Sequence, residues 1–423
     1  MKLESFFGLL TKILFTIILL FCINTKMVCA IGLYNDDSLR ISLFTCSAGD
    51  DLYSKFGHTG IRVQNASIGD DIVFNYGMFN YSSENFIWRF IMGYTDYELG
   101  AEITSSFIDR YKKEGIAVNE QILNITNKEA KNLYRALMIN YMPANRIYRY
   151  DFLYDNCTTR AKEIIESSLY DAAILYDISS SDSLRTYRDM LHTCLKDNPW
   201  LVLGIDCLLG AEIDCISNTK NSIFLPKDLM NVLNNSNIKY DNGLCKKTVL
   251  SNNFIVKESN DLEVEATYKL GFLHPVFIFT CILLLSILLM VFEIKKGVVF
   301  WIFDIFIMSI LGLSGLIVAF LFFFSKHPAV DSNWLVIVFN PLFLVWIPFQ
   351  IYNNIWEKKS KLHMICFCIL SLFVILIPFI PQEINISAIL LILTMIIRNL
   401  SNVLVDSRIP NMYYDYKSKF SVS

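Results

Sequence analysis

Histidine is scarce in this chain, with 5 residues among 423, and 40 acidic against 37 basic residues leave a formal net charge of only −3. No cluster of basic residues stands out, so the composition argues against a nucleic-acid partner. The CxxC spacing that is typical of zinc sites is absent, and so are internal repeats and low-complexity segments. The composition therefore favours neither a nucleic-acid-binding protein nor a zinc protein.

Apolar residues are abundant and unevenly placed. They make up 54% of the chain, and residues 267–407 consist mostly of Leu, Ile, Phe and Val, while residues 31–266 have a mixed composition. A length of 423 residues is sufficient for two or three domains. We therefore expect an extracytoplasmic domain over 31–266, a membrane domain over 267–407 and a cytoplasmic tail over 408–423.

The first 30 residues are typical of an export signal. Lys2 and Lys12 precede or flank the apolar run ILFTIILLFC, and the sequence VCA at 28–30 resembles a small-residue cleavage site. Residues 1–30 are therefore interpreted as a signal peptide or a retained signal anchor. Both interpretations put residues 31–266 outside the cytoplasm.

Five apolar runs are each about long enough to span a bilayer, which takes about 20 residues in a helix. They lie near 270–292, 298–325, 333–351, 362–381 and 386–406. Lysines gather in the first and third connecting loops, at 295 and 296 and at 358, 359 and 361, whereas the second and fourth loops hold only Lys326. By the positive-inside rule the first and third loops are cytoplasmic, which agrees with an exported domain ahead of them.

Two ionisable residues, Asp304 and Arg398, fall inside these spans at similar expected depth, where charged groups are costly. Either they pair with each other as a structural clasp, or Arg398 extends to the membrane surface. In the third span, Asn340-Pro341 predicts a kink.

In the outer domain, the segment CTTRAKEIIESSL predicts a helix that begins near Cys157, with Asp155 or Asn156 as its N-cap. Its expected core-facing residues are Cys157, Ala161, Ile164, Ile165 and Ser168. Free N–H groups and the dipole at a helix N-terminus favour a thiolate over a thiol. Cys157 is therefore a candidate nucleophile, and the alternative is a packed structural cysteine.

A nucleophilic thiol needs a base, and the small number of histidines narrows the choice. Three lie in or beside the spans, and His192 lies on a predicted helix, where a surface or core role is expected. His58 lies in LYSKFGHTGIRVQN, which alternates as a strand and precedes a second strand, DIVFNYGMF. That strand offers Asn75 or Tyr76 to orient the imidazole, and Asn75 is preferred because an amide oxygen can accept from an imidazole N–H.

The order of FGHTGIRV before YDNCTTR resembles circularly permuted papain-like domains, in which the histidine strand precedes the cysteine helix. The segments LFTCSAGDDLYSKFGHTGIRV, DIVFNYGMF, YDFLYDNCTTR, NPWLVLGIDCLLGAEID and FLP, in consistent order over about 38–230, resemble the extracytoplasmic domain of Lnb-type bacterial lipoprotein N-acyltransferases. The resemblance implies an α+β papain-like domain of the NlpC type, followed by an α-helical multi-span membrane domain. It assigns the nucleophile to Cys157 and the base to His58, and it leaves the third residue open.

Enzymes of this family add an acyl chain to the N-terminal amine of diacylglyceryl-cysteine lipoproteins. The resemblance therefore implies a membrane phospholipid as donor, a diacylated lipoprotein as acceptor, and an inner-membrane location with the catalytic domain in the periplasm. A thioester on Cys157 would link the two half-reactions, with backbone N–H groups at the helix start stabilising the oxyanion. Asn156 either caps the helix, which is preferred, or helps to bind the oxyanion. This chemistry requires neither a metal nor an organic cofactor.

Two stretches of the outer domain suit a bilayer surface, NFIWRFIMGY with Trp88 and Phe90, and NPWLVLGIDCLLG with Trp200. Either they form an interfacial or acyl-binding surface, or they pack in the core. Exported cysteines often form disulfides, and Cys207 can pair with Cys194 or with Cys215.

The Cys–His pair is also compatible with other functions. An envelope cysteine peptidase or amidase, or a phospholipase, would use the same two residues. A non-enzymatic membrane assembly factor with a degenerate domain is a further alternative, and it predicts that Cys157 and His58 can be replaced without loss of function.

Overall fold

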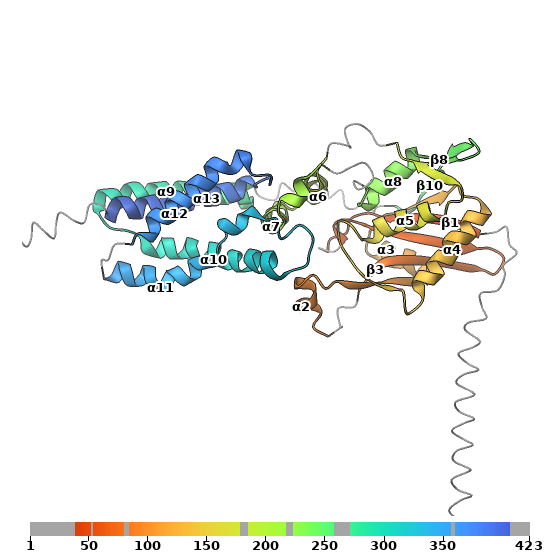
Figure 1. Ribbon diagram of the computed structural model, residues 1–423, viewed down its shortest axis with the longest axis horizontal. Coiled ribbons are helices and arrows are strands. Elements are labelled where there is room, and N and C mark those ends of the chain that lie inside the picture. Colours follow the sequence, from red (N-terminus) through yellow and green to blue (C-terminus); the bar gives the residue numbers. More distant parts are fainter. Residues whose placement is uncertain are drawn as a thin grey trace, which may run out of the picture.

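The computed structural model describes residues 39–51, 54–79, 84–177, 185–216, 223–257, 271–356 and 360–406. The predicted export signal over 1–30 and the predicted tail over 408–423 lie outside the described residues. The described chain forms a sheet-containing domain and a helical bundle that lie end to end (Figure 1). Helices α6 (Tyr187–Leu195) and α7 (Pro199–Leu208) lie between them.

The outer domain is built on a sheet of seven strands in the spatial order β10-β5-β1-β2-β3-β4-β6, with every neighbouring pair antiparallel. The strands are β1 (Leu39–Cys46), β2 (His58–Asn65), β3 (Asp70–Met78), β4 (Asp96–Ile103), β5 (Val118–Leu123), β6 (Ile147–Arg149) and β10 (Val249–Val256). The two strands predicted around His58 and Asn75 are therefore present, and they pair directly as β2 and β3.

Helices cover both faces of this sheet. On one face, α4 (Asn127–Tyr141), α5 (Cys157–Ser168) and α8 (Pro226–Asn235) bury apolar side chains against Ile61 and Val63 of β2. On the other face, α3 (Thr104–Lys113) packs Phe107 against Phe44 of β1. The short helix α2 (Phe86–Ile91) differs from these, because it buries none of its residues. The packing of α5 against the sheet thus fixes the position of Cys157.

Smaller elements complete the outer domain. A second sheet joins β7 (Ala172–Leu175), β8 (Asn237–Tyr240) and β9 (Cys245–Lys247). A 3-10 turn, η3 (Ala211–Asp214), follows α7, and another, η5 (Gly271–Leu273), precedes the first span. All cysteines in the described part of the chain are free thiols, so neither of the possible disulfides of Cys207 is formed.

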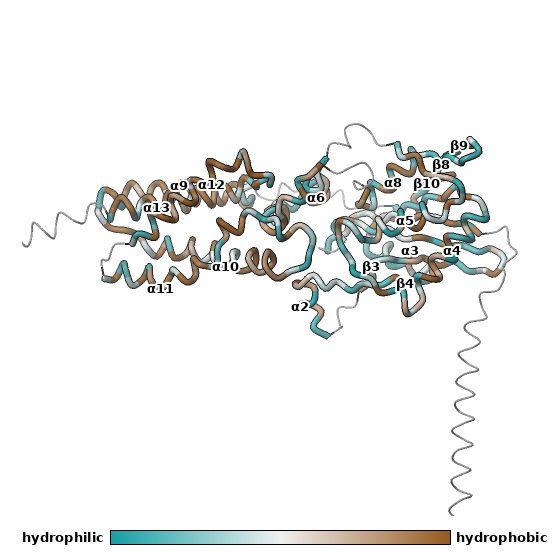
Figure 2. Tube along the Cα trace, viewed as in Figure 1, coloured by the Kyte–Doolittle hydropathy of each residue, from teal (hydrophilic) through white to brown (hydrophobic). Residues whose placement is uncertain are grey.

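Within the described residues, five helical segments are long and apolar enough to cross a membrane, as the sequence predicted. They are Pro275–Lys296 (α9), Trp301–Phe324 (α10), Trp334–Ile355, Leu362–Phe379 and Ile386–Asp406 (α13). The third span consists of η6 (Trp334–Ile337) and α11 (Leu342–Ile355), and the fourth of α12 (Leu362–Leu376) and η7 (Ile377–Phe379). Figure 2 shows hydrophobic residues concentrated along these helices and a mixed pattern in the outer domain. The break in the third span lies at Asn340-Pro341, where a kink was predicted.

A buried ionic cluster joins three of the spans. Arg398 of α13 donates to Asp304 of α10 at 2.5 Å, as one of the two sequence interpretations expected. Glu293 of α9 is a third member that sequence reasoning missed, and its carboxylate accepts from Arg398 at 2.7 and 2.9 Å. Since Arg398 is only 1% exposed, the alternative in which it extends to the membrane surface is wrong.

The two parts of the chain are joined by hydrogen bonds as well as by packing. The loop between α10 and η6 meets the end of α7, where the Gly210 N–H donates to the Ala329 carbonyl at 2.6 Å. Asn385, just ahead of α13, donates to Asp206 of α7 at 2.7 Å. A Cβ at Gly210 would lie 2.3 Å from the backbone of Ser332, so only glycine allows this approach. The outer domain is therefore held at a fixed place above the spans.

Candidate active site

The register of the central strands brings His58 and Asn75 together. His58 is the first residue of β2, and Gly60, two residues further on, is paired with Asn75 of β3. Side chains two residues apart on a strand share a face, and the His58 Nε2 lies 3.1 Å from the Asn75 Oδ1. Tyr76, the other residue considered for this contact, points to the opposite side, where its hydroxyl accepts from Asn140.

The orientation of the Asn75 amide follows from its second partner. The Nδ2 of Asn75 donates to the Glu102 carboxylate at 2.9 Å, and a carboxylate oxygen can only accept. The Oδ1 of Asn75 must therefore face His58 and accept from its Nε2–H. Arg110 donates to the same carboxylate at 2.8 and 3.2 Å. With Nε2 held in this way, Nδ1 is the imidazole nitrogen left for Cys157.

Cys157 is the first residue of α5, and its position is fixed by the cap of that helix. Asn156 is the N-cap, and its Oδ1 accepts from the N–H groups of Thr158 at 2.8 Å and Thr159 at 2.9 Å. Its Nδ2 donates to two carbonyls, those of Phe152 and Phe224, at 2.9 and 3.0 Å. These four bonds hold the backbone that carries the thiol.

Two details of the predicted helix start need correction. Asp155 is not the cap, because its carboxylate forms an ion pair with Arg160 at 2.5 and 2.6 Å. The N–H groups of Thr158 and Thr159 are occupied by Asn156, and so is the amide of Asn156 itself. These groups are therefore not available to bind an oxyanion, and the expectation stays a prediction for the backbone N–H of Cys157 itself.

The thiol of Cys157 meets His58 and Thr59 of β2. The His58 side chain and the backbone of Thr59 both lie close enough to lower the pKa of the Cys157 thiol, and the Thr158 hydroxyl lies 3.9 Å from its sulfur. The hydroxyls of Thr59 and Thr158 lie 3.0 Å apart and tie β2 to α5 beside the thiol. Cys157 is 8% exposed, so these contacts are largely shielded from water.

The electrostatics of this pair favour a thiolate beside an imidazolium. Burial opposes ionisation of Cys157, but the charge and hydrogen bond of His58 outweigh it and lower the pKa of the thiol. Burial likewise opposes protonation of His58, but Cys157 and the hydrogen bond of Asn75 outweigh it and raise the pKa of the imidazole. The two shifts share a cause, because each charged form stabilises the other.

An aromatic pair lies near the Cβ of Cys157. Gly77 of β3 has a φ of 88°, and a Cβ there would lie 3.3 Å from the Tyr150 ring and 4.0 Å from the Cys157 Cβ. Tyr150 stacks on Tyr97, with ring centroids 4.6 Å apart. Burial, together with the nearby Cys157, raises the pKa of the Tyr150 phenol, so this phenol is neutral at physiological pH.

Neither Cys46 nor His192 shares this chemistry. Cys46 is the cross-strand partner of His58 in β1, but burial raises the pKa of its thiol, so it remains a neutral core residue. His192 lies on α6 and contacts Asp206 at 2.8 Å, at the junction with the membrane domain. It belongs to a separate polar cluster with Arg188.

The three aromatic residues predicted at the bilayer surface lie at the outer ends of spans. Trp88 packs on Phe320 near the end of α10, with ring centroids 5.6 Å apart. Trp200 donates its indole N–H to the carbonyl of Leu273, just ahead of α9, at 2.8 Å. Phe90 is 46% exposed, so a packed core role does not describe it.

Comparison with protein families gives two matches that together cover most of the chain. Residues 30–192 match the Lnb N-terminal periplasmic domain, and residues 267–408 match the Lnb transmembrane domain. The chain belongs to the Lnb family. This Lnb protein is thus a membrane protein with a periplasmic-type domain followed by five candidate spans, and the family fits a role in lipoprotein biogenesis. Comparisons with curated proteins and with solved structures give no match.

Sequence reasoning missed the residues that support His58 and Cys157 in this Lnb protein. Glu102 lies 27 positions beyond Asn75 and reaches it only through the pairing of β3 with β4, and Arg110 reaches Glu102 from α3. Thr59 could have been found from the sequence, since it follows His58 directly. Tyr150 could have been found too, because it begins the segment that leads into Cys157.

Proposed function

We propose that this Lnb protein is a lipoprotein N-acyltransferase that uses Cys157 as nucleophile and His58 as proton carrier. The observation that carries the proposal is the contact between a largely buried thiol of lowered pKa and an imidazole that Asn75 orients. This arrangement is what acyl transfer through a thiol requires. The domain is joined to five spans, which suits substrates that are themselves anchored in a membrane.

The first half-reaction loads the acyl chain onto the enzyme. The Cys157 thiolate attacks the ester carbonyl of a membrane phospholipid, and a carbon–sulfur bond forms as the ester carbon–oxygen bond breaks. The departing lysophospholipid alkoxide takes the proton of the His58 imidazolium. The products are a thioester on Cys157, neutral lysophospholipid and neutral His58, so atoms and charge balance.

The second half-reaction delivers the chain to the acceptor. The neutral α-amino group of a diacylglyceryl-cysteine lipoprotein attacks the thioester, and a carbon–nitrogen bond forms as the carbon–sulfur bond breaks. His58 takes the proton that the amine loses, which restores the thiolate–imidazolium pair. Asn75 keeps the imidazole in place through both steps, because its Oδ1 accepts from Nε2–H in both protonation states of the ring.

The membrane domain contributes by placing the reaction at the bilayer surface. Both proposed substrates are confined to the membrane, so a tethered site meets them at high effective concentration. A peptidase or amidase of the cell envelope would not need this tether. The proposed location is the inner membrane, with the catalytic domain in the periplasm.

The test is an acylation assay with the full chain in detergent or vesicles. Phosphatidylethanolamine and a diacylated lipopeptide are supplied, and mass spectrometry follows the lipopeptide, the lysolipid and Cys157. We expect triacylated lipopeptide from the wild type and none from Cys157→Ala or His58→Ala. With the acceptor withheld, an acyl mass is expected on the Cys157 peptide.

Other outcomes of this assay identify the alternative functions. Lysolipid and free fatty acid without triacylated product would indicate a phospholipase. Cleavage of envelope peptides with no lipid turnover would indicate a peptidase or amidase. Full function of both variants in cells that depend on this protein would indicate an assembly factor and remove the catalytic proposal.

A further inference from the structure

A continuous series of aromatic rings leads from Cys157 to the outer end of a span. After Tyr150 and Tyr97, the series continues through Phe79, Phe86 and Phe90, with successive ring centroids 4.9, 5.8 and 6.3 Å apart. We call these five residues the aromatic ladder. It begins near Cys157, because the Tyr150 ring and the Cys157 Cβ both lie within 4.0 Å of the position that a Cβ at Gly77 would take.

The far end of the ladder is fixed to the membrane domain. Phe90 contacts the His327 ring at 5.2 Å, and its carbonyl lies 2.6 Å from the His327 Nε2. Ser325, which follows α10 directly, donates to the Ile91 carbonyl at 2.8 Å. Helix α2, which carries Phe86 and Phe90, is therefore attached where α10 leaves the bilayer.

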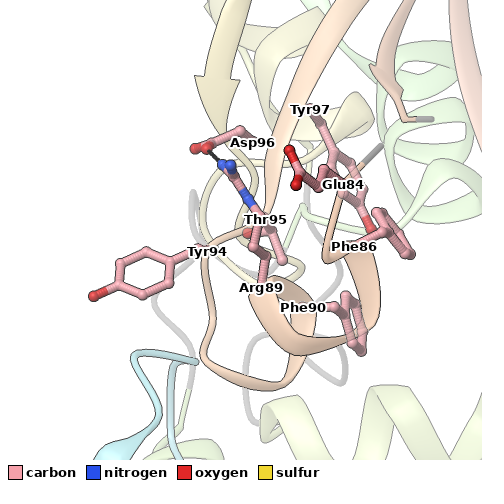
Figure 3. Close-up of a pocket in the computed structure, with 8 residues that line it drawn as sticks. All are labelled: Glu84, Phe86, Arg89, Phe90, Tyr94, Thr95, Asp96 and Tyr97. Atoms are coloured by element: carbon pink, nitrogen blue, oxygen red, sulfur yellow. Dashed lines mark hydrogen bonds and ion pairs between the residues drawn. The ribbon is translucent and has the colours of Figure 1, made fainter. Parts of the chain in front are cut away.

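Three rings of the ladder, Tyr97, Phe86 and Phe90, line a pocket. Figure 3 shows Phe86, Phe90 and Tyr97 on one side of it and the ion pair of Arg89 with Asp96 on the other. The pocket has a volume of about 210 Å³, which is room for roughly seven groups the size of a water molecule. A cavity of this size can take part of an acyl chain but not a folded peptide.

Charged groups also line the pocket, and among them the Glu84 carboxylate lies on the side of Tyr97 and Phe86 (Figure 3). Arg149 forms an ion pair with Asp96 at 3.1 Å and lies over the Tyr94 ring, and Lys326 lies over the same ring. Three cationic side chains therefore gather around Asp96 and Tyr94, away from Phe86 and Phe90. An amphiphile with an anionic headgroup matches this division, because its chain can lie on the rings and its phosphate near the cations.

The solvent exposure of the rings changes along the ladder in the way that an entry path for a lipid chain requires. Tyr97 is 9% exposed, while Phe90 at the far end is 46% exposed. The ladder thus runs from buried rings near Cys157 to an exposed ring against a span. An acyl chain bound as a thioester to Cys157 needs an apolar surface that leads back to the bilayer, since leaving it in water is unfavourable.

We propose that the aromatic ladder binds the acyl chain that is transferred, from the outer leaflet at α2 to the thioester on Cys157, and thereby sets the preferred chain length. The proposal rests on the function proposed above for Cys157. The occupant is one chain of a membrane phospholipid. Phe86 is the fourth of the five rings and stacks on both Phe79 and Phe90, so its removal interrupts the path without touching Cys157 or His58.

The test compares donors of different chain length. Phosphatidylethanolamines with 8-carbon and with 16-carbon chains are given separately to the wild type, to Phe86→Ala and to Phe254→Ala. Phe254 is a matched control, because it is an exposed phenylalanine on β10, at the opposite edge of the sheet from β4 and β6. Alkylation of Cys157 by iodoacetamide reports separately whether each variant keeps an intact site.

For Phe86→Ala we expect kcat/KM with the 16-carbon donor to fall roughly tenfold relative to the 8-carbon donor, as loss of contact with about two methylene groups would produce. Phe254→Ala should keep the wild-type ratio, and Phe86→Leu should restore part of it. An unchanged ratio in Phe86→Ala with normal alkylation would overturn the ladder.

Failure of the proposed function gives a different result from failure of the ladder. If the wild type releases lysolipid but never acylates the lipopeptide, N-acyl transfer is wrong, and the chain-length ratio is then measured on lysolipid release. A lower ratio of 16-carbon to 8-carbon donor turnover in Phe86→Ala than in the wild type would still support the ladder. The same ratio in both proteins would still refute it.

Discussion

Replacing Asn75 by alanine tests the central geometry of the site. Asn75 is 2% exposed, and its Oδ1 lies 3.1 Å from the Nε2 of His58. The substitution removes the amide group of Asn75, which orients the His58 imidazole. Glu102 keeps its two hydrogen bonds to Arg110, so no buried carboxylate is left without a partner.

The size of the effect follows from the lost hydrogen bond. A hydrogen bond to a charged group contributes about 1.5–3 kcal/mol, and one pKa unit corresponds to about 1.4 kcal/mol. The Asn75 bond raises the pKa of His58, so its loss should lower that pKa. A weaker imidazole base holds the thiol proton less well, and the thiolate population of Cys157 should fall about 10- to 100-fold.

Alkylation of Cys157 measures that population directly. The rate of reaction with iodoacetamide is followed by peptide mass spectrometry from pH 5 to pH 10, which separates Cys157 from the other cysteines. In the wild type the rate should remain high below the ordinary thiol pKa of about 8.5. In Asn75→Ala the profile should move toward that ordinary value, and activity should fall in parallel.

A matched substitution separates this effect from general destabilisation. Asn119 is also buried in the sheet, on β5, and has no hydrogen bond to His58. Asn119→Ala should leave the alkylation profile unchanged, and the thermal unfolding of both variants should be recorded. The reasoning is refuted if folded Asn75→Ala keeps the wild-type profile, since the ring would then not depend on Asn75.

Two further predictions concern pH and the membrane core. Activity should have a bell-shaped pH profile. It is lost below the lowered pKa of Cys157, where the thiolate is protonated, and above the raised pKa of His58, where the imidazolium that protonates the leaving group disappears. A profile without a loss of activity at low pH would contradict the thiolate. Arg398→Met should destabilise the spans by about 3–5 kcal/mol, because it leaves the buried carboxylates of Glu293 and Asp304 without their cation. Thermal unfolding in detergent measures this, with the milder Asp304→Asn beside it, and an unchanged transition in Arg398→Met would rule out the clasp.

Local sequence determined much of this protein. The spans follow from long apolar runs, because a bilayer selects for length and hydrophobicity alone. The strand at His58, the helix start at Cys157 and the cap at Asn156 follow from alternation and capping, which act over a few residues. Asp155 was left open as a cap, because an Asp and an Asn in succession satisfy the same local rule and only the ion pair with Arg160 separates them.

Contacts between distant segments were decided only by the tertiary structure. The partnership of Glu102 and Arg110 with Asn75 depends on strand pairing and on how α3 packs, and the third member of the membrane cluster, Glu293, depends on how α9 meets α13. The aromatic ladder draws on β4, α2 and the ends of β3 and β6, so no periodicity in the sequence reveals it. Sequence patterns record which face of an element is buried, whereas the identity of the opposing side chain is set by the packing of the whole chain.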